Sequence, residues 1–147
     1  MKIANKILKY QTKGEFDFID ITDEVKKFVE ESQIKNGLVN IQTLHTTASV
    51  ILNENEPLLL EDIKKNLEKL SPGNIKYDHD DFTVRTVNVC PDECVNGRSH
   101  CKAIYLPVNI TLNLIDGKIQ LGQWQSVMLL ELDSSRSRKI QIQVIGE

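Results

Sequence analysis

The chain is organised around one stretch of sequence, Leu38-Val-Asn-Ile-Gln-Thr-Leu-His-Thr-Thr-Ala-Ser-Val-Ile-Leu-Asn-Glu-Asn-Glu56. Apolar and polar residues alternate over 38–44, and this period of two predicts a β-strand with one buried face. Residues 49–52 form a second short extended run. His45 stands between the two runs and is followed by the hydroxyl groups of Thr46 and Thr47. The stretch therefore predicts two strands joined by polar side chains that can carry chemistry.

Helices are predicted on either side of this stretch, because apolar residues recur there at helical spacing. Thr22 is expected to cap the first helix, since its hydroxyl can accept a hydrogen bond from a free amide of the first turn. Pro57 fits the first turn of the second helix, where its missing N–H costs little. The apolar stripes are Val25, Phe28 and Val29 in the first helix and Leu59, Ile63, Leu67 and Leu70 in the second.

The C-terminal half is rich in strand patterns. Asp116-Gly117 favours a tight hairpin turn between two strands. The longest apolar cluster, Val127-Met-Leu-Leu130, fits a buried strand. Residues 75–97 show no sustained period and predict a long polar loop, which in a compact domain is usually functional or disordered. Further strands are expected at residues 2–10 (an edge strand), 16–21, 100–104, 110–115, 119–124, 126–132 and 139–145.

These elements predict an α+β fold in which mostly antiparallel β-sheets pack as a sandwich or distorted barrel with two main helices. The 147 residues are expected to form one domain, residues 1–147. A formal net charge of −3 gives no electrostatic case for nucleic-acid binding. Lysines interrupt the N-terminal segment, where a signal peptide needs an unbroken apolar core. No apolar run approaches the ~20 residues that cross a membrane. Three cysteines without an export signal predict reduced thiols and a cytoplasmic location.

The three histidines, His45, His79 and His100, are the main candidates for chemistry. Imidazole is the commonest metal ligand, and catalytic zinc keeps three protein ligands and one open position. We therefore expect the three to hold one divalent metal ion, with zinc as the expected metal. The alternative is that each is an independent surface or core residue, because their wide spacing carries no local ligand motif. The carboxylates of Asp78 and Asp80 could orient the His79 ring, or simply form a solvated acidic turn.

Carboxylates and thiols supply further candidates. Glu54, which follows Asn53, and Glu131 could serve as a general base or orient a ligand, although a lone glutamate usually has no such role. The close spacing of Cys90 and Cys94, followed by Cys101, suggests a metal site, but the second close pair of cysteines that such sites usually have is missing. Small buried hydrophobic roles are the expected ones for these thiols.

Arg136 and Arg138 offer forked donors that suit a phosphate or a carboxylate. Thr46 and Thr47 could donate to the same group. Together they favour a small anionic or phosphorylated ligand, against the alternative of a polar hairpin turn with solvated arginines.

Several segments match, in order, the motifs of a known family. They are Leu44-His-Thr-Thr-Ala-Ser-Val-Ile-Leu-Asn-Glu-Asn-Glu56, Tyr77-Asp-His79, Asn96-Gly-Arg-Ser-His100, Asp116-Gly-Lys-Ile-Gln-Leu-Gly-Gln-Trp-Gln125, Glu131-Leu-Asp133 and Arg136-Ser-Arg138. On these motifs the chain resembles the YjbQ-type family over nearly all residues after position 20. The resemblance implies a compact α+β domain, usually a homotrimer, with a metal- or anion-binding pocket near a subunit boundary.

The resemblance also implies roles for single residues and an activity. His45, His79 and His100 carry over as the expected metal ligands. The expected catalytic residues are Glu54, Glu131 and Arg136, and the expected substrate-binding residues are Thr46, Thr47, Asn53 and Arg138. Family members are named secondary thiamine-phosphate synthases, so a transferase that joins a pyrimidine diphosphate to a thiazole phosphate is expected. The alternatives are a metal-dependent hydrolase of a small anionic substrate and a non-catalytic trimer that binds a metal or an anion.

Overall fold

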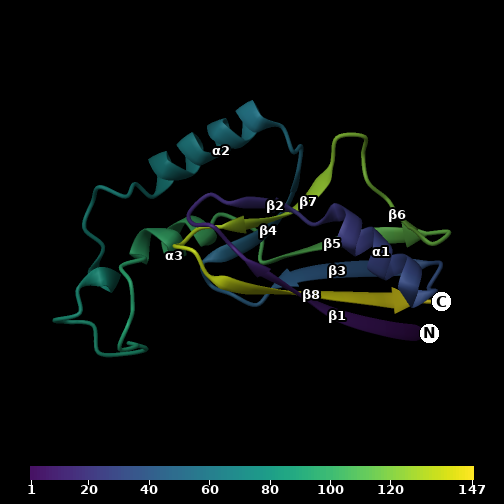
Figure 1. Cartoon of the computed structure of the whole chain (residues 1–147), viewed down its shortest axis with the longest axis horizontal. Helices are drawn as coiled ribbons and strands as arrows, with labels where there is room; N and C mark the ends of the chain where they lie inside the picture. The colour runs from purple at the N-terminus through teal and green to yellow at the C-terminus, as the bar shows by residue number, and fades with distance from the viewer.

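The alternating patterns of the sequence form two antiparallel β-sheets with helices packed around them (Figure 1). A computed structural model describes residues 1–147. Its elements are β1 (Lys2–Gln11), β2 (Phe18–Asp20), α1 (Thr22–Ser32), β3 (Gly37–Thr43), β4 (Ala48–Asn53), α2 (Pro57–Leu70), the short 3-10 helix η1 (Asp78–Asp80), α3 (Gly97–Ala103), β5 (Asn109–Ile115), β6 (Lys118–Ile119), β7 (Ser126–Glu131) and β8 (Ser137–Gly146). None of the helices has the length and apolar character needed to cross a membrane.

The larger sheet, sheet A, has the strand order β1-β8-β3-β5-β6. The first strand pairs with the last along its full length, from Lys2 opposite Gly146 to Gln11 opposite Ser137. β1 is therefore an edge strand, as the sequence predicts. Asp116 and Gly117 both adopt positive φ, 52° and 77°, which is the geometry of the tight hairpin turn expected at this dipeptide.

The smaller sheet, sheet B, has the order β2-β7-β4 and is buried on both faces. One face packs with α1 and the inner face of sheet A into the main core. The other face is covered by α2, whose Leu60, Ile63 and Leu67 pack against Met128 and Leu130 of β7. Burial on both faces explains the unbroken apolar run of β7, and the predicted buried strand is confirmed. The expected α+β class with packed antiparallel sheets is confirmed as well.

The two main helices begin by different means. The expected cap at Thr22 is wrong: Ile21 occupies the cap position, and the Thr22 hydroxyl instead donates to Asp20 Oδ1 and accepts from the Val127 amide. The second helix is capped by Glu56, whose carboxylate accepts from two amides of the first turn. Pro57 stands in that first turn, as expected.

Residues 100–103 lie in helix α3, with Ile104 as its C-cap, where the sequence predicts a strand over residues 100–104. α3 buries Ser99 and Lys102 completely, so its inward face is polar and the apolar pattern does not reveal it. Lys102 can be buried because its ammonium lies 2.8 Å from a carboxylate oxygen of Glu15 and 2.8 Å from one of Glu68. The predicted strand at 119–124 is also shorter than expected and ends at Ile119.

Candidate functional site

A polar pocket of about 620 Å³ lies where the β3–β4 turn, the η1–α3 segment and the β7–β8 turn meet. Only two of its 16 lining residues are hydrophobic, so the pocket suits a polar ligand rather than an apolar one. Among its lining residues are His45, Thr47, His79, His100, Arg136 and Arg138. Residues spread over about two-thirds of the chain therefore meet at one place.

His79 and His100 form a close pair in this pocket. Their ring centroids are 4.7 Å apart and the rings are inclined at 60°. Asp80, next to His79, accepts hydrogen bonds from the backbone amides of Asn96 and Gly97 at 2.9 and 2.8 Å. Of the two alternatives left open for these carboxylates, orienting the His79 ring or forming a solvated turn, Asp80 follows neither, because its two hydrogen bonds join η1 to the start of α3. These bonds hold the two histidines together.

The contact between η1 and α3 depends on Gly97. A Cβ atom at this position would lie 2.6 Å from the Cβ of Tyr77, closer than two carbon atoms can approach. The absence of a side chain therefore allows the segment that carries His79 to pack against the helix that carries His100. Gly97 therefore helps to position both rings, although it does not itself line the pocket.

The expected zinc centre is wrong. No group of three or more histidine, cysteine, aspartate or glutamate side chains lies in an arrangement that could hold a metal ion. His45 lines the same pocket as His79 and His100, but its Nε2 accepts a hydrogen bond from the Lys139 amide at 2.7 Å. That nitrogen is therefore occupied by the backbone of β8, and His45 cannot join the other two rings around one ion through it.

Two of the histidines are disposed to be neutral. Burial lowers the pKa of His100 below 6.5, and the neighbouring His79 lowers it further, outweighing the opposite effect of Asp133. Burial and the cation of Arg138 also lower the pKa of His45. At neutral pH both imidazoles are therefore uncharged, and His100 is a base able to accept a proton.

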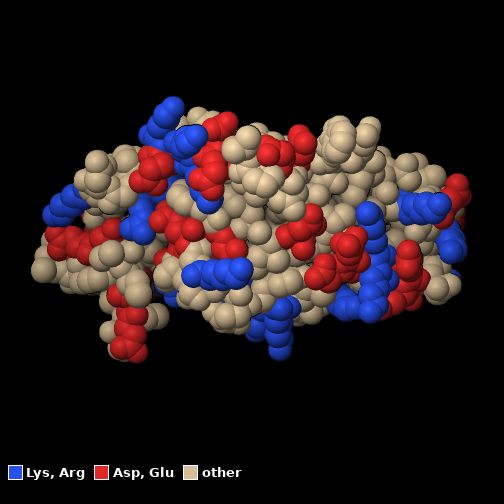
Figure 2. Space-filling view, turned by 45° about the horizontal axis from the view of Figure 1, so that its top comes forward, with Lys and Arg blue, Asp and Glu red and all other residues tan.

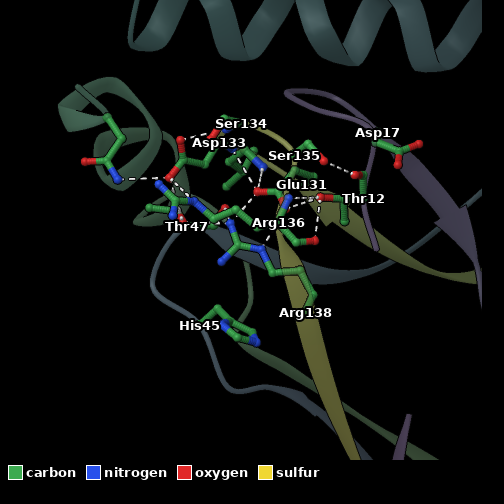
Figure 3. A network of polar contacts seen from close by, with 12 residues as sticks. Thr12, Asp17, His45, Thr47, Glu131, Asp133, Ser134, Ser135, Arg136 and Arg138 are labelled. Carbon is green, nitrogen blue, oxygen red and sulfur yellow. Dashed lines mark hydrogen bonds and ion pairs between the residues drawn. The ribbon is translucent and has the colours of Figure 1, made fainter. Parts of the chain in front are cut away.

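Arg138 is held by a buried carboxylate at the base of the pocket (Figure 3). Its guanidinium donates through Nε and Nη2 to the two oxygens of Glu131, and through Nη2 also to the Thr47 hydroxyl at 2.9 Å. Glu131 is fully buried and accepts further bonds from the Thr12 hydroxyl and from the amides of residues 132 and 133. Both oxygens of Glu131 thus accept hydrogen bonds from protein groups, and the carboxylate positions Arg138 rather than facing the pocket.

Arg136 is held more lightly, on the rim. Its Nε donates to Asp133 Oδ2 at 2.9 Å, and its two terminal nitrogens make no hydrogen bond to the protein. Asp133 is nearly buried, and the same oxygen also accepts from the Asn96 amide nitrogen at 2.9 Å. Although burial raises the pKa of Asp133, hydrogen bonds from Asn96 and Ser134 and the cation of Arg136 outweigh it and hold the pKa below its usual value. Asp133 is therefore an ionised carboxylate that fixes Arg136 and Asn96 side by side.

The other predicted site residues separate into two groups. Thr46 and Thr47 line the pocket, with Thr46 exposed and Thr47 buried beneath it. Asn53 and Glu54 do not line it, because they lie at the opposite end of β4, where Asn53 is the last residue of the strand and Glu54 follows it. The structure therefore does not bring Glu54 to the histidines.

Four polar residues of the pocket that bind other side chains were not singled out from the sequence: Arg85, Glu93, Asn96 and Asp133. Arg85 and Glu93 form an ion pair at 2.7 Å that ties down the 85–93 segment, and Arg85 also donates to three backbone carbonyls of that region. No local pattern marks these two residues. Asn96 and Asp133 do stand inside the N-G-x-x-H and E-x-D motifs, and those motifs were the signal available for them.

The cysteines contribute little to the site. All three are free and exposed, so the expected buried role is wrong. Cys90 lines the pocket, whereas Cys94 and Cys101 do not.

Comparisons with known proteins agree with this architecture. The family model described as "UPF0047 protein YjbQ-like" matches residues 6–147. A UPF0047 protein of Methanothermobacter thermautotrophicus is 35% identical over 147 residues, covering 100% of this chain and 95% of its own. A crystal structure of a YbjQ-like protein of unknown function from Sulfolobus solfataricus superposes with a TM-score of 0.86 at 32% identity, covering 99% of both chains. A second structure, from Clostridium acetobutylicum, gives a TM-score of 0.81 at 31% identity, covering 95% of this chain and 99% of its own.

These names correct the expected activity. The matched relatives are named only as UPF0047 proteins, and the Sulfolobus solfataricus structure is described as one of unknown function. None of these relatives carries a thiamine-phosphate synthase or transferase name, so the expected synthase has no support beyond the resemblance that suggested it.

Proposed function

Because the chain belongs to the YjbQ-like UPF0047 family, whose matched members are named without an activity, we propose its function from the pocket itself: the pocket binds a small phosphorylated or otherwise anionic molecule. The observation that supports this most directly is the pair of arginines. Each has one side of its guanidinium fixed by a buried carboxylate, while other N–H groups remain without a protein partner.

This arrangement favours anion binding because the donors are fixed in place before the ligand arrives. Nη1 of Arg138 and both terminal nitrogens of Arg136 are the open donors, and the exposed hydroxyl of Thr46 lies on the same pocket. Forked, charged N–H groups match the oxygens of a phosphate or carboxylate. Since the side chains are already immobilised, a ligand loses less conformational entropy in organising them.

Calorimetric titration with inorganic phosphate and pyrophosphate tests this proposal. We expect binding to the wild type and a loss of about tenfold or more in affinity for Arg136→Gln, because a hydrogen bond to a charged group contributes ~1.5–3 kcal/mol. Arg98→Gln is the matched control, since it removes the same charge from a residue that pairs with Glu15 outside this pocket. Glu54→Gln should also leave the affinity unchanged. Equal affinities for the Arg136 and Arg98 variants would rule out the proposed role.

A second function, hydrolysis of the bound ligand, is favoured by the histidine pair. A neutral His100 takes a proton from a water molecule as its oxygen attacks the phosphorus or carbonyl atom of an ester. The ester bond then breaks, and the imidazolium returns the proton to the leaving alkoxide. General base catalysis typically contributes ~10²–10⁴-fold. On a panel of small phosphate esters and lactones we therefore expect His100→Gln to lower kcat by about a hundredfold or more while phosphate affinity is retained. Phosphate binding without turnover of any of these esters would identify a binding protein instead.

Self-association and location are also proposed. One face of sheet A is covered by no other element, and a lateral apolar row crosses it at Ile3, Ile145 and Leu38, with Ile3 56% and Leu38 44% exposed. We assign this face to the homotrimer that the resemblance implies. Sedimentation velocity should show a trimer for the wild type and a smaller species for Leu38→Asp.

The three free thiols favour the reducing cytoplasm, which cell fractionation would test.

A further inference from the structure

Asn96 carries a buried oxygen that no protein donor reaches. The residue is 7% exposed and lines the pocket, and its Oδ1 is without a hydrogen-bond partner. Nε2 of His79 is a second buried atom of the same pocket without a partner; the nearest carboxylate oxygen, on Glu93, is 3.9 Å away. Buried polar atoms are nearly always paired in folded proteins, so such atoms around a pocket indicate groups that a ligand satisfies.

The direction of the Asn96 amide is fixed by its neighbour. Its Nδ2 donates to Asp133 Oδ2 at 2.9 Å, and an ionised carboxylate can only accept hydrogen bonds. The nitrogen must therefore face Asp133, and the oxygen must face away from it. Rotating the amide would place two acceptors against each other.

The backbone of Asn96 adds a second constraint. The residue occupies the cap position of α3, yet its side chain makes no cap hydrogen bond to the helix. Asparagine is favoured at such positions because it normally accepts a bond from the first turn. Here the side chain makes no such bond, and its Nδ2 donates to Asp133 instead. The backbone N–H of Asn96 donates to Asp80 Oδ1 at 2.9 Å. The free oxygen is thus held in place rather than left to rotate.

The free acceptor stands next to the anion-binding donors. Asp133 Oδ2, which fixes the Asn96 amide, also accepts from Nε of Arg136 at 2.9 Å. One carboxylate oxygen therefore joins the two side chains, and Arg136 and Asn96 both line the same pocket. A single small molecule can contact both.

We propose that the ligand is bifunctional, with an anionic group bound by Arg136 and Arg138 and, a few bonds away, a hydroxyl or amino group that donates to Asn96 Oδ1. This inference rests on the proposed anion binding and specifies its substrate class: a small phosphorylated or carboxylated alcohol or amine. A ligand that lacks the donor leaves the buried oxygen unpaired. We expect a ligand with the donor to bind about tenfold more tightly than the same ligand without it.

Two pairs of compounds test the inference at two spacer lengths. Ethyl phosphate is compared with 2-hydroxyethyl phosphate, and propyl phosphate with 3-hydroxypropyl phosphate, by calorimetric titration into the full-length protein. We expect at least one hydroxyl compound to bind about tenfold more tightly than its alkyl partner. In Asn96→Ala this preference should disappear while the alkyl phosphates still bind. Thr46→Ala, a change elsewhere in the same pocket, should preserve the preference.

The outcomes separate this inference from the proposal on which it depends. If phosphate and all four esters bind but neither hydroxyl compound is preferred, the bifunctional ligand is refuted and the anion site stands. A preference that survives in Asn96→Ala also refutes it. If neither phosphate nor any ester binds, both proposals fall. Should Asn96→Ala not fold, the wild-type comparison of alkyl and hydroxyl compounds still decides.

Discussion

The two ends of β4 differ in every respect that bears on function. At one end Ala48 lies opposite Glu131, beside the buried network that holds Arg138. At the other end Asn53 lies opposite Ser126, near an exposed loop whose Trp124 is 67% accessible. A strand rises ~3.3 Å per residue, so the six residues of β4 separate its ends by roughly 17 Å. Neighbours within a sequence motif can thus belong to different surfaces.

The pocket end gathers its groups from distant parts of the chain. His79 and His100 come from a segment without strand pattern, and Arg136 from the turn before the last strand. What brings them together is a set of carboxylates, each used to fix a neighbour: Asp80 for the start of α3, Asp133 for Arg136, and Glu131 for Arg138. At the far end, Asp20 and Glu56 instead accept hydrogen bonds from Asn55 and from the first turn of α2, away from the pocket, and this difference can be tested.

The largest expected difference is in stability. Glu131→Gln should lower the free energy of unfolding by ~3–5 kcal/mol, because it leaves the buried guanidinium of Arg138 without its counter-charge. Glu54→Gln, at the far end, should change it by less than about 0.5 kcal/mol. Urea unfolding followed by circular dichroism measures both. Similar losses for the two variants would contradict the assignment of Glu131 as a positioning residue.

A smaller difference is expected for two glycines. Gly97→Ala should destabilise the protein by ~1–3 kcal/mol, because the new methyl group would overlap the Tyr77 side chain. Gly122→Ala is the control at the far end, where the nearest atom to an added Cβ is a flexible glutamine oxygen at 3.4 Å. Thermal unfolding compares the two, and the distance between His79 and His100 should increase in a crystal structure of Gly97→Ala alone. An unchanged unfolding temperature for Gly97→Ala would show that η1 does not pack tightly on α3.

The smallest effect concerns pH. The pKa of His100 is lowered below 6.5 in the folded state, so the unfolded state binds more protons between the lowered value and about 6.5. Stability should therefore rise with pH through that window and be lost as pH falls through it. His100→Gln should flatten this dependence in part, with the remainder due to His45, whose pKa is lowered as well. Urea midpoints between about pH 5 and about pH 7.5 measure the slope, and an identical slope in the variant would argue against the shift.

Much of the fold is predictable from local pattern. The alternation in β3 and β8, the apolar run of β7 and the Asp116-Gly117 turn each have one physical explanation, and each is found as expected. α3 is not predictable in this way. Its seven residues are too few for a periodic signal, and the residues that it buries include Ser99 and Lys102, which an apolar pattern cannot mark.

The site shows the same division. Side-chain chemistry and the family resemblance both indicated the histidines and arginines that line the pocket. They did not reveal that a backbone amide occupies His45 Nε2, that Glu131 is enclosed, or that Glu54 lies at the other end of a strand. Those facts depend on strand direction and on long-range pairing, which neither composition nor spacing encodes.

The strand order of the sheets also affects how the chain folds during its synthesis. β1 finds its partner in the last strand, and β2 and β4 are joined only by β7, which is synthesised after residue 125. Both sheets therefore rely on contacts between residues far apart in the chain, a feature that slows folding. Until β7 has been synthesised, the apolar residues of β4 have no strand with which to pair. We expect the nascent chain to need protection from aggregation until its final quarter emerges.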